Sequence, residues 1–104
     1  MIPIISSRGN IIVVSPHDII SVSAPKGELL IRTKKRSGRP LRSLQEYERL
    51  LAPFGFELAS RSTLVNTEQI WTFCEENQLL FFDKLHKIEA VKVSRRNVHK
   101  FLDY

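Results

Sequence analysis

The chain has 104 residues, of which 42% are hydrophobic and 26% charged, a composition that suits one globular domain over residues 1–104. Its single cysteine excludes an intrachain disulfide, and it shows neither a signal-peptide pattern nor an apolar run long enough to span a bilayer. We therefore predict a cytoplasmic protein that makes no use of a membrane. The net charge of +5 favours an acidic partner: nucleic acid, an anionic surface or an acidic protein.

The positive charge is concentrated in two segments. Residues 26–42 and 84–100 are strongly basic, and the stretch between them, residues 43–83, is net acidic. If the two basic segments fold onto one face, the opposite face is left acidic. The charge pattern thus predicts one basic face for an acidic partner.

The first third of the chain reads as short strands separated by turns. Asn10–Val14 is a β-branched run, and residues 19–33 read as a hairpin with its turn at Pro25-Lys26-Gly27-Glu28. Ser37-Gly38 marks the next turn. Arg39–Arg42 is expected to form another short strand, which Pro40 would place at a sheet edge.

The clearest helix runs from Ser43 to Phe54. Ser43 and Glu46 have the spacing of a capping box, and Pro53 and Gly55 mark its end. Five apolar residues recur at helical spacing and predict one buried face: Leu44, Tyr47, Leu50, Leu51 and Phe54.

The last half again reads as strands. Phe56–Ser60 precedes a polar loop at Arg61–Thr63, and Gln69–Cys74 and Gln78–Phe82 form a second expected hairpin. His86–Val93 is a further candidate strand. Ser94 is expected to cap a short final helix whose core-facing residues would be Val98, Phe101 and Leu102.

Patterns of catalytic or cofactor-binding sites are missing from the sequence. It contains no phosphate-binding glycine loop and no H-E-x-x-H, and His17, His86 and His99 have no metal-ligand spacing. We therefore expect a protein that is not an enzyme, with no cofactor, no metal and no small-molecule substrate.

Two segments carry a family resemblance. They are Phe56–Asn66, which ends in Leu-Val-Asn, and Val93-Ser-Arg-Arg-Asn97. With Asp18–Val22 and the helix at 43–54, in this order, they resemble the LytTR DNA-binding domain from about residue 10 onward. The pair of motifs in this order is fairly specific, whereas either motif alone is weak.

The resemblance implies a mainly β fold, elongated and antiparallel, with one or two short helices. It also implies a sequence-specific double-stranded DNA binder in transcription regulation, which contacts the grooves through loops. Members of the family often follow a receiver domain in response regulators and bind paired direct repeats. A homodimer on DNA is expected on the same ground.

Matching the family pattern residue by residue gives the expected base contacts, which are Lys26, Arg61 and Arg96. Arginine can grip guanine with two hydrogen bonds, and short hydroxyls near it suit phosphate. The expected phosphate contacts are therefore Ser60, Ser62, Ser94, Arg95, Asn97 and Lys100. The chain departs from many family members at Leu58, Ser60 and Gly27, so the target sequence does not follow from relatives. Asn66 is expected to bond local backbone rather than DNA.

Two other functions fit the sequence. The first is a protein-interaction module of a regulatory complex, using the acidic hairpin at 69–83 or its aromatic residues. The second is a nonspecific binder of single strands, for which Trp71, Phe73, Phe81 and Phe82 would supply stacking surfaces. Basic side chains gathered along the loops at 25–28, 60–63 and 94–97 would favour double-stranded DNA over both.

Overall fold

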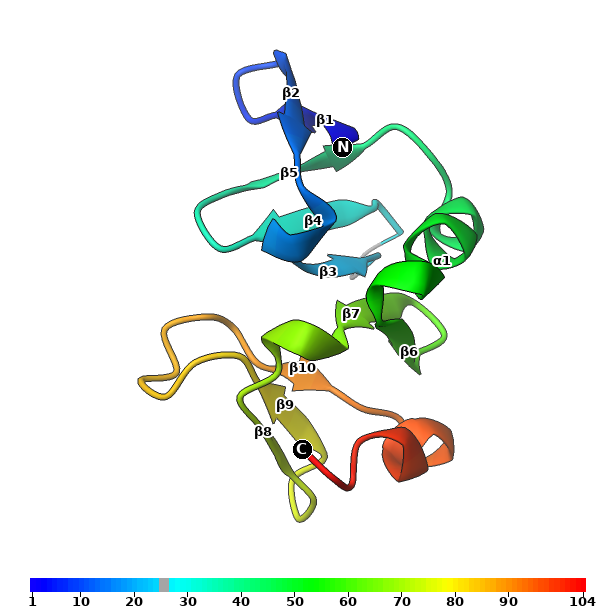
Figure 1. Cartoon of the computed structure of the whole chain (residues 1–104), viewed down its shortest axis with the longest axis vertical. Helices are drawn as coiled ribbons and strands as arrows, with labels where there is room; N and C mark the ends of the chain where they lie inside the picture. The colour runs from blue at the N-terminus through cyan, green and yellow to red at the C-terminus, as the bar shows by residue number, and fades with distance from the viewer. Residues whose placement is uncertain (25–26) are drawn as a thin grey trace.

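The computed structural model describes residues 1–24 and 27–104. Its extents of 40 × 28 × 26 Å make the molecule longer along one axis. Two antiparallel sheets follow one another along that axis (Figure 1). The larger sheet is formed by the N-terminal part of the chain, and the smaller one by the C-terminal part. The fold is mainly β, elongated and antiparallel, as predicted.

The larger sheet has seven strands in the order β2-β1-β5-β4-β3-β7-β6. These are β1 (Ile2–Ser6), β2 (Ile11–Val14), β3 (Ile19–Ser23), β4 (Leu30–Thr33), β5 (Ser37–Pro40), β6 (Phe56–Ser60) and β7 (Thr63–Asn66). The predicted hairpin at 19–33 is confirmed as β3 and β4, which pair antiparallel with Val22 opposite Ile31.

The N-terminal strand β1 escaped sequence reasoning, and its position changes the strand that follows the hairpin. The predicted edge strand Arg39–Arg42 is wrong, because β5 lies between β1 and β4 and runs two residues earlier. Gly38 belongs to the strand and not to a turn. A Cβ atom there would lie 2.8 Å from the Ile5 carbonyl oxygen, so the close approach of β1 to β5 requires glycine.

The smaller sheet has three strands in the order β10-β9-β8, which are β8 (Thr72–Cys74), β9 (Leu79–Phe81) and β10 (Val91–Lys92). The second predicted hairpin is confirmed, although β8 begins later than expected, after a 3-10 turn η3 at Thr67–Gln69. The expected strand His86–Val93 shrinks to β10, because Asp83 accepts hydrogen bonds from the backbone of Lys87 and Ile88 and holds that segment as a loop.

One α-helix, α1 (Leu44–Leu51), packs on the larger sheet. Its capping box is confirmed: the Ser43 hydroxyl accepts from the Glu46 backbone N–H, and a Glu46 carboxylate oxygen accepts from the Ser43 N–H, both at 3.2 Å. A 3-10 turn η2 (Ala52–Phe54) continues the helix to Gly55, whose φ of 87° ends it. The apolar face is narrower than predicted, because Leu50 and Phe54 are exposed.

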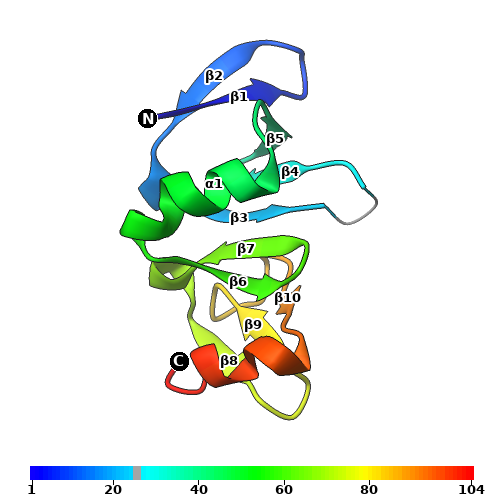
Figure 2. The ribbon, with the colours of Figure 1, turned by 90° about the vertical axis from the view of Figure 1, so that its right-hand side faces the viewer.

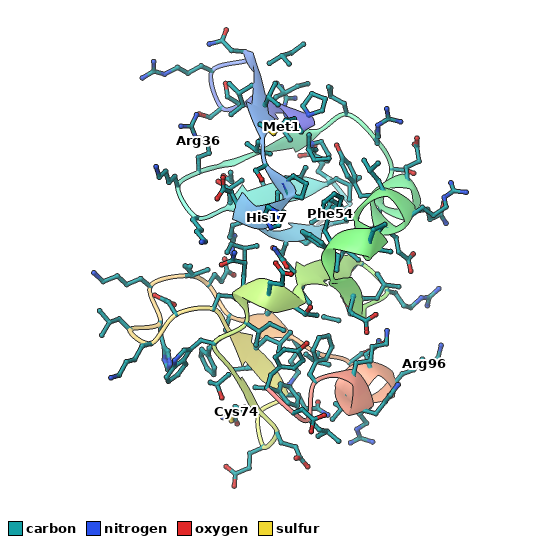
Figure 3. The ribbon with its side chains drawn as sticks, viewed as in Figure 1. Met1, His17, Arg36, Phe54, Cys74 and Arg96 are labelled. Atoms are coloured by element: carbon teal, nitrogen blue, oxygen red, sulfur yellow. The ribbon has the colours of Figure 1, made fainter. Side chains whose placement is uncertain are left out.

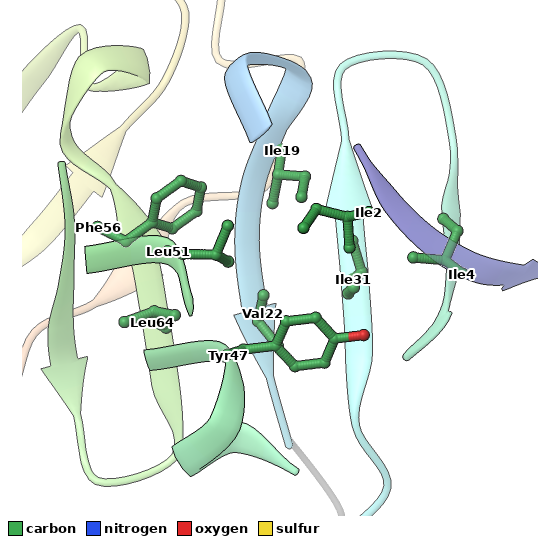
Figure 4. Packing of buried hydrophobic residues seen from close by; sticks show 9 residues of the cluster. All are labelled: Ile2, Ile4, Ile19, Val22, Ile31, Tyr47, Leu51, Phe56 and Leu64. Carbon is green, nitrogen blue, oxygen red and sulfur yellow. The ribbon is translucent and has the colours of Figure 1, made fainter. Parts of the chain in front are cut away.

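Strands β3, β6 and β7 separate two hydrophobic cores, since neighbouring residues of a strand point to opposite faces. On β7, Leu64 belongs to the first core and Val65 to the second. Figure 4 shows the first core, where Tyr47 and Leu51 of α1 lie over Val22 of β3. The second core packs this sheet against β8–β10 and against η4 (Arg95–Lys100), a 3-10 helix. Phe101 is fully buried there, but Leu102, predicted to face the core, is exposed.

Candidate nucleic-acid interface

Two backbone hydrogen bonds bring three predicted contact regions together. The Ala24 N–H, at the end of β3, donates to the Ser62 carbonyl in the β6–β7 turn at 3.0 Å. The Ser94 N–H, at the start of η4, donates to the Ala59 carbonyl of β6 at 2.9 Å. The end of β3, the β6–β7 turn and the start of η4 therefore lie along one side of the molecule, here called the loop edge (Figure 2).

The β6–β7 turn is tighter than the predicted loop. Thr63 already belongs to β7, so only Arg61 and Ser62 form the tip. The Ser60 hydroxyl accepts from the Ser62 N–H at 3.3 Å, which fixes the turn and leaves the Arg61 side chain exposed. This hydrogen bond thus fixes the backbone of the turn that carries Arg61, a predicted base contact.

The start of η4 is held against β6. The register of β6 with β7 shifts between Leu58 and Ser60, and the Ala59 carbonyl accepts from Ser94 instead. The expected helix cap is wrong in its chemistry, because the Ser94 hydroxyl makes no bond to a backbone N–H of the helix. That hydroxyl accepts from the Asn97 side-chain amide at 2.7 Å, beside the exposed Arg95 and Arg96.

The remaining predicted contacts differ in how they are held. Lys100 donates from its Nζ to the Leu58 carbonyl at 3.2 Å and is half-buried, as is Asn97. Lys100 thus helps to dock η4 on β6, and the Asn97 side chain donates to Ser94 at the start of η4. Lys26 lies outside the described residues. Ser60, Arg61, Ser62, Ser94, Arg95 and Arg96 are all brought to the loop edge.

A groove of about 510 Å³ runs beside the loop edge, between β4 and the segment that leads into β10. Six serine and threonine residues contribute to its lining: Ser21, Ser23, Ser60, Ser62, Thr63 and Ser94. Arg32 pairs with Glu89 within it at 3.0 Å. Sequence reasoning missed Arg32, although its place between buried Ile31 and Thr33 on a strand indicates that it faces the other way.

The charge pattern predicted a single basic face, but the basic side chains do not gather on one face. Arg36 and Arg96 lie on opposite sides of the molecule in Figure 3. One group, with Arg61, Arg95 and Arg96, accompanies the loop edge. A second group lies where the β4–β5 turn meets the loop at 87–89, and both loops line one hollow there. The prediction of one basic face is wrong, because the β6–β7 turn and η4 carry the first group and the turn after β4 carries the second.

Two further properties concern metals and membranes. Within residues 1–24 and 27–104, no three His, Cys, Asp or Glu side chains are placed to hold a metal ion. No helix in the same ranges is long and apolar enough to cross a membrane.

Comparison with known proteins agrees with this architecture. The family model of the LytTr DNA-binding domain matches residues 9–104. The fold is similar to the LytTr DNA-binding domain of a protein described as a methyl-accepting/DNA response regulator from Bacillus cereus, with a TM-score of 0.80. The two are 24% identical, and the alignment covers 95% of this chain and 90% of the other. No curated protein matches the sequence.

The family match covers nearly the whole chain and contains every element of the loop edge. It confirms the predicted resemblance and gives DNA as the partner. The chain belongs to the LytTR family of DNA-binding domains.

Proposed function

We propose that the domain recognises a specific double-stranded DNA sequence through the loop edge, as a transcription regulator. The observation that carries the proposal is the pair of backbone bonds, Ala24 to Ser62 and Ser94 to Ala59. They join the segments that carry Arg61 and Arg96, and base reading requires side chains held in defined positions.

The chemistry of the loop edge suits a duplex. Exposed arginines can form paired hydrogen bonds to guanine in the major groove. The hydroxyls of Ser60, Ser62 and Ser94 are of the kind that contacts phosphate, and Arg95 adds positive charge beside them. In the proposal Arg61, Arg96 and Lys26 read bases, and Ser60, Ser62, Ser94, Arg95, Asn97 and Lys100 contact the backbone. Binding to direct repeats as a homodimer belongs to the same proposal.

Selection of bound duplexes from a random pool tests it. The wild-type protein is compared with the double variant Arg61→Ala/Arg96→Ala at near-physiological salt. A matched control is Arg8→Ala/Arg49→Ala, which removes the same charge from exposed positions outside the loop edge. We expect the wild type and the control to enrich one motif that the loop-edge variant fails to enrich.

Binding measurements on the selected site separate base reading from charge neutralisation. Arg61→Ala and Arg96→Ala should each weaken binding to that site by about 1–3 kcal/mol and change binding to random DNA much less. Affinity should also fall steeply with salt, because counterions are released from the duplex. Equal losses on both DNAs would contradict base reading, and a flat salt response or preference for single strands would contradict the proposal.

A further inference from the structure

A second group of exposed cations lies away from the loop edge. The β4–β5 turn supplies Lys34, Lys35 and Arg36, and the loop between β9 and β10 supplies Lys87. The two loops border a shared hollow of about 350 Å³, on the side of the molecule where Figure 3 labels Arg36. None of these four side chains forms an ion pair with any described residue.

Local hydrogen bonds fix the backbone of both loops. The Thr33 hydroxyl accepts from the Arg36 N–H at 3.1 Å and donates to the Arg36 carbonyl at 2.9 Å, which closes the β4–β5 turn. The Asp83 carboxylate accepts from the Lys87 N–H at 2.8 Å. The Arg32–Glu89 ion pair joins β4 to the loop that carries Lys87. The four cations therefore border one hollow on fixed backbone, and none of them is ion-paired with a described residue.

Exposed apolar side chains adjoin these cations. His86, next to Lys87, stacks on Phe81 with ring centroids 4.1 Å apart, and Trp71 lies 6.2 Å from His86. Trp71 is 50% exposed and Leu85, in the same loop, is 72% exposed. Both apolar side chains therefore remain in contact with water in the described structure, which is unfavourable. A cluster of exposed apolar side chains typically marks an interaction site.

We propose that these residues form a docking surface for an acidic segment of a partner protein that also carries leucine or aromatic side chains. We call it the cationic–aromatic surface: Lys34, Lys35, Arg36, Lys87, Leu85, Trp71, His86 and Phe81. The carboxylates of such a segment pair with the cations, and its apolar side chains cover Leu85 and Trp71. A DNA duplex fits less well, because it presents phosphates outside and keeps the apolar faces of its bases stacked within.

The geometry separates this surface from DNA reading. A strand advances by about 3.3 Å per residue. The β4–β5 turn therefore lies roughly one strand length from the end of β3, which belongs to the loop edge. The domain can therefore hold DNA along the loop edge while the cationic–aromatic surface recruits a regulatory partner. The two proposals rest on different residues and can fail independently.

The single tryptophan of the chain, Trp71, allows a direct test by its fluorescence. The probe is a short synthetic peptide in which aspartate alternates with leucine and phenylalanine. A second peptide has serine in place of the apolar residues. We expect saturable change of Trp71 emission with the first peptide, weakening with salt, and binding of the serine peptide at least about tenfold weaker, the effect of losing roughly one buried apolar contact.

Charge variants provide the matched control. Lys35→Glu/Lys87→Glu should weaken binding of the first peptide by about tenfold or more, since like charges repel it. Arg8→Glu/Arg49→Glu makes the same change in net charge at exposed positions elsewhere and should bind the peptide nearly as the wild type does. Leu85→Ser should weaken binding of the first peptide and leave binding of the serine peptide unchanged. A loss of charge alone would not give this result.

Several results would overturn the proposal. Equal binding of both peptides would show that the apolar side chains take no part. A Trp71 response to an oligonucleotide but to neither peptide would assign the surface to nucleic acid. Self-association abolished by Lys35→Glu/Lys87→Glu would assign it to a second copy of the chain. The DNA motif selected by Lys35→Glu/Lys87→Glu should match that of the wild type, which keeps this test distinct from that of DNA reading.

Discussion

At the scale of single residues, Asn66 shows how a polar side chain in a DNA-binding motif can serve the fold. It is 1% exposed, and its amide donates to the Pro16 and Ile19 carbonyls at 3.3 and 3.0 Å. Its side-chain oxygen accepts from the Glu68 N–H at 3.1 Å. The predicted structural role is confirmed, and it reaches beyond local backbone, since Asn66 ties β7 to the segment before β3.

Replacing Asn66→Ala should lower the free energy of unfolding by roughly 2–4 kcal/mol, because two carbonyls in buried hydrogen bonds and one N–H in a part-buried bond lose their partner. Urea denaturation measures the change. The exposed Asn10→Ala variant is the control and should stay within about 0.5 kcal/mol of the wild type. A fully stable Asn66→Ala protein that no longer bound DNA would instead assign Asn66 to the interface.

At the scale of elements, the capping box of α1 links helix stability to pH. The Ser43 N–H and hydroxyl donate to the Glu46 carboxylate, and these bonds hold the pKa of Glu46 below its ordinary value of 4.5. A depressed pKa means that the carboxylate contribution is fully present above that ordinary value. It is lost as the pH falls through the lowered pKa of the folded state.

Ser43→Ala should destabilise the domain by about 1 kcal/mol at neutral pH through loss of the serine cap itself. The pKa of Glu46 should rise toward its ordinary value, which an NMR titration of the Glu46 side chain measures. The stability gap between variant and wild type should narrow in acid, because protonated Glu46 no longer accepts these bonds. A gap that widened below pH 4.5, or an equal effect of Ser37→Ala at an exposed position of β5, would contradict the capping explanation.

At the scale of the whole molecule, the folded domain begins earlier in the chain than the family match does. The family model begins at residue 9, yet β1 lies inside the larger sheet, paired with both β2 and β5. Ile2 and Ile4 of β1 are 5% and 0% exposed in the first core. The residues before the family match therefore support the fold, whereas the loop edge is built on β3, β6, β7 and η4.

Deleting residues 1–8 should lower the free energy of unfolding by roughly 3–6 kcal/mol, the value of two buried isoleucine side chains. Thermal and urea denaturation measure it, and Ile4→Ala should account for about 2–5 kcal/mol by itself. Under conditions where the shortened chain remains folded, it should select the same DNA motif as the full chain. Loss of the motif in a folded shortened chain would show that the first core shapes the loop edge.

The sequence by itself determined the elements whose signals are local. The capping box at Ser43, the hairpin at 19–33 and the strand Phe56–Ser60 all follow from neighbouring residues, and two motifs with their order identified the family. Arg61 and Arg96 could be chosen from the same motifs. The meeting of their segments could not be predicted, because it depends on bonds between residues more than 30 positions apart in sequence, such as Ser94 to Ala59.

Only the tertiary structure decided features that depend on partners distant in sequence. Gly38 reads as a turn residue until β1 packs beside it, and Leu50, Phe54 and Leu102 read as core residues until the limits of each core are known. The charge pattern likewise could not show that β4 sends Lys34–Arg36 to the end of the sheet opposite the loop edge. Burial, strand order and the position of surface charge follow from which segments meet, which local patterns do not record.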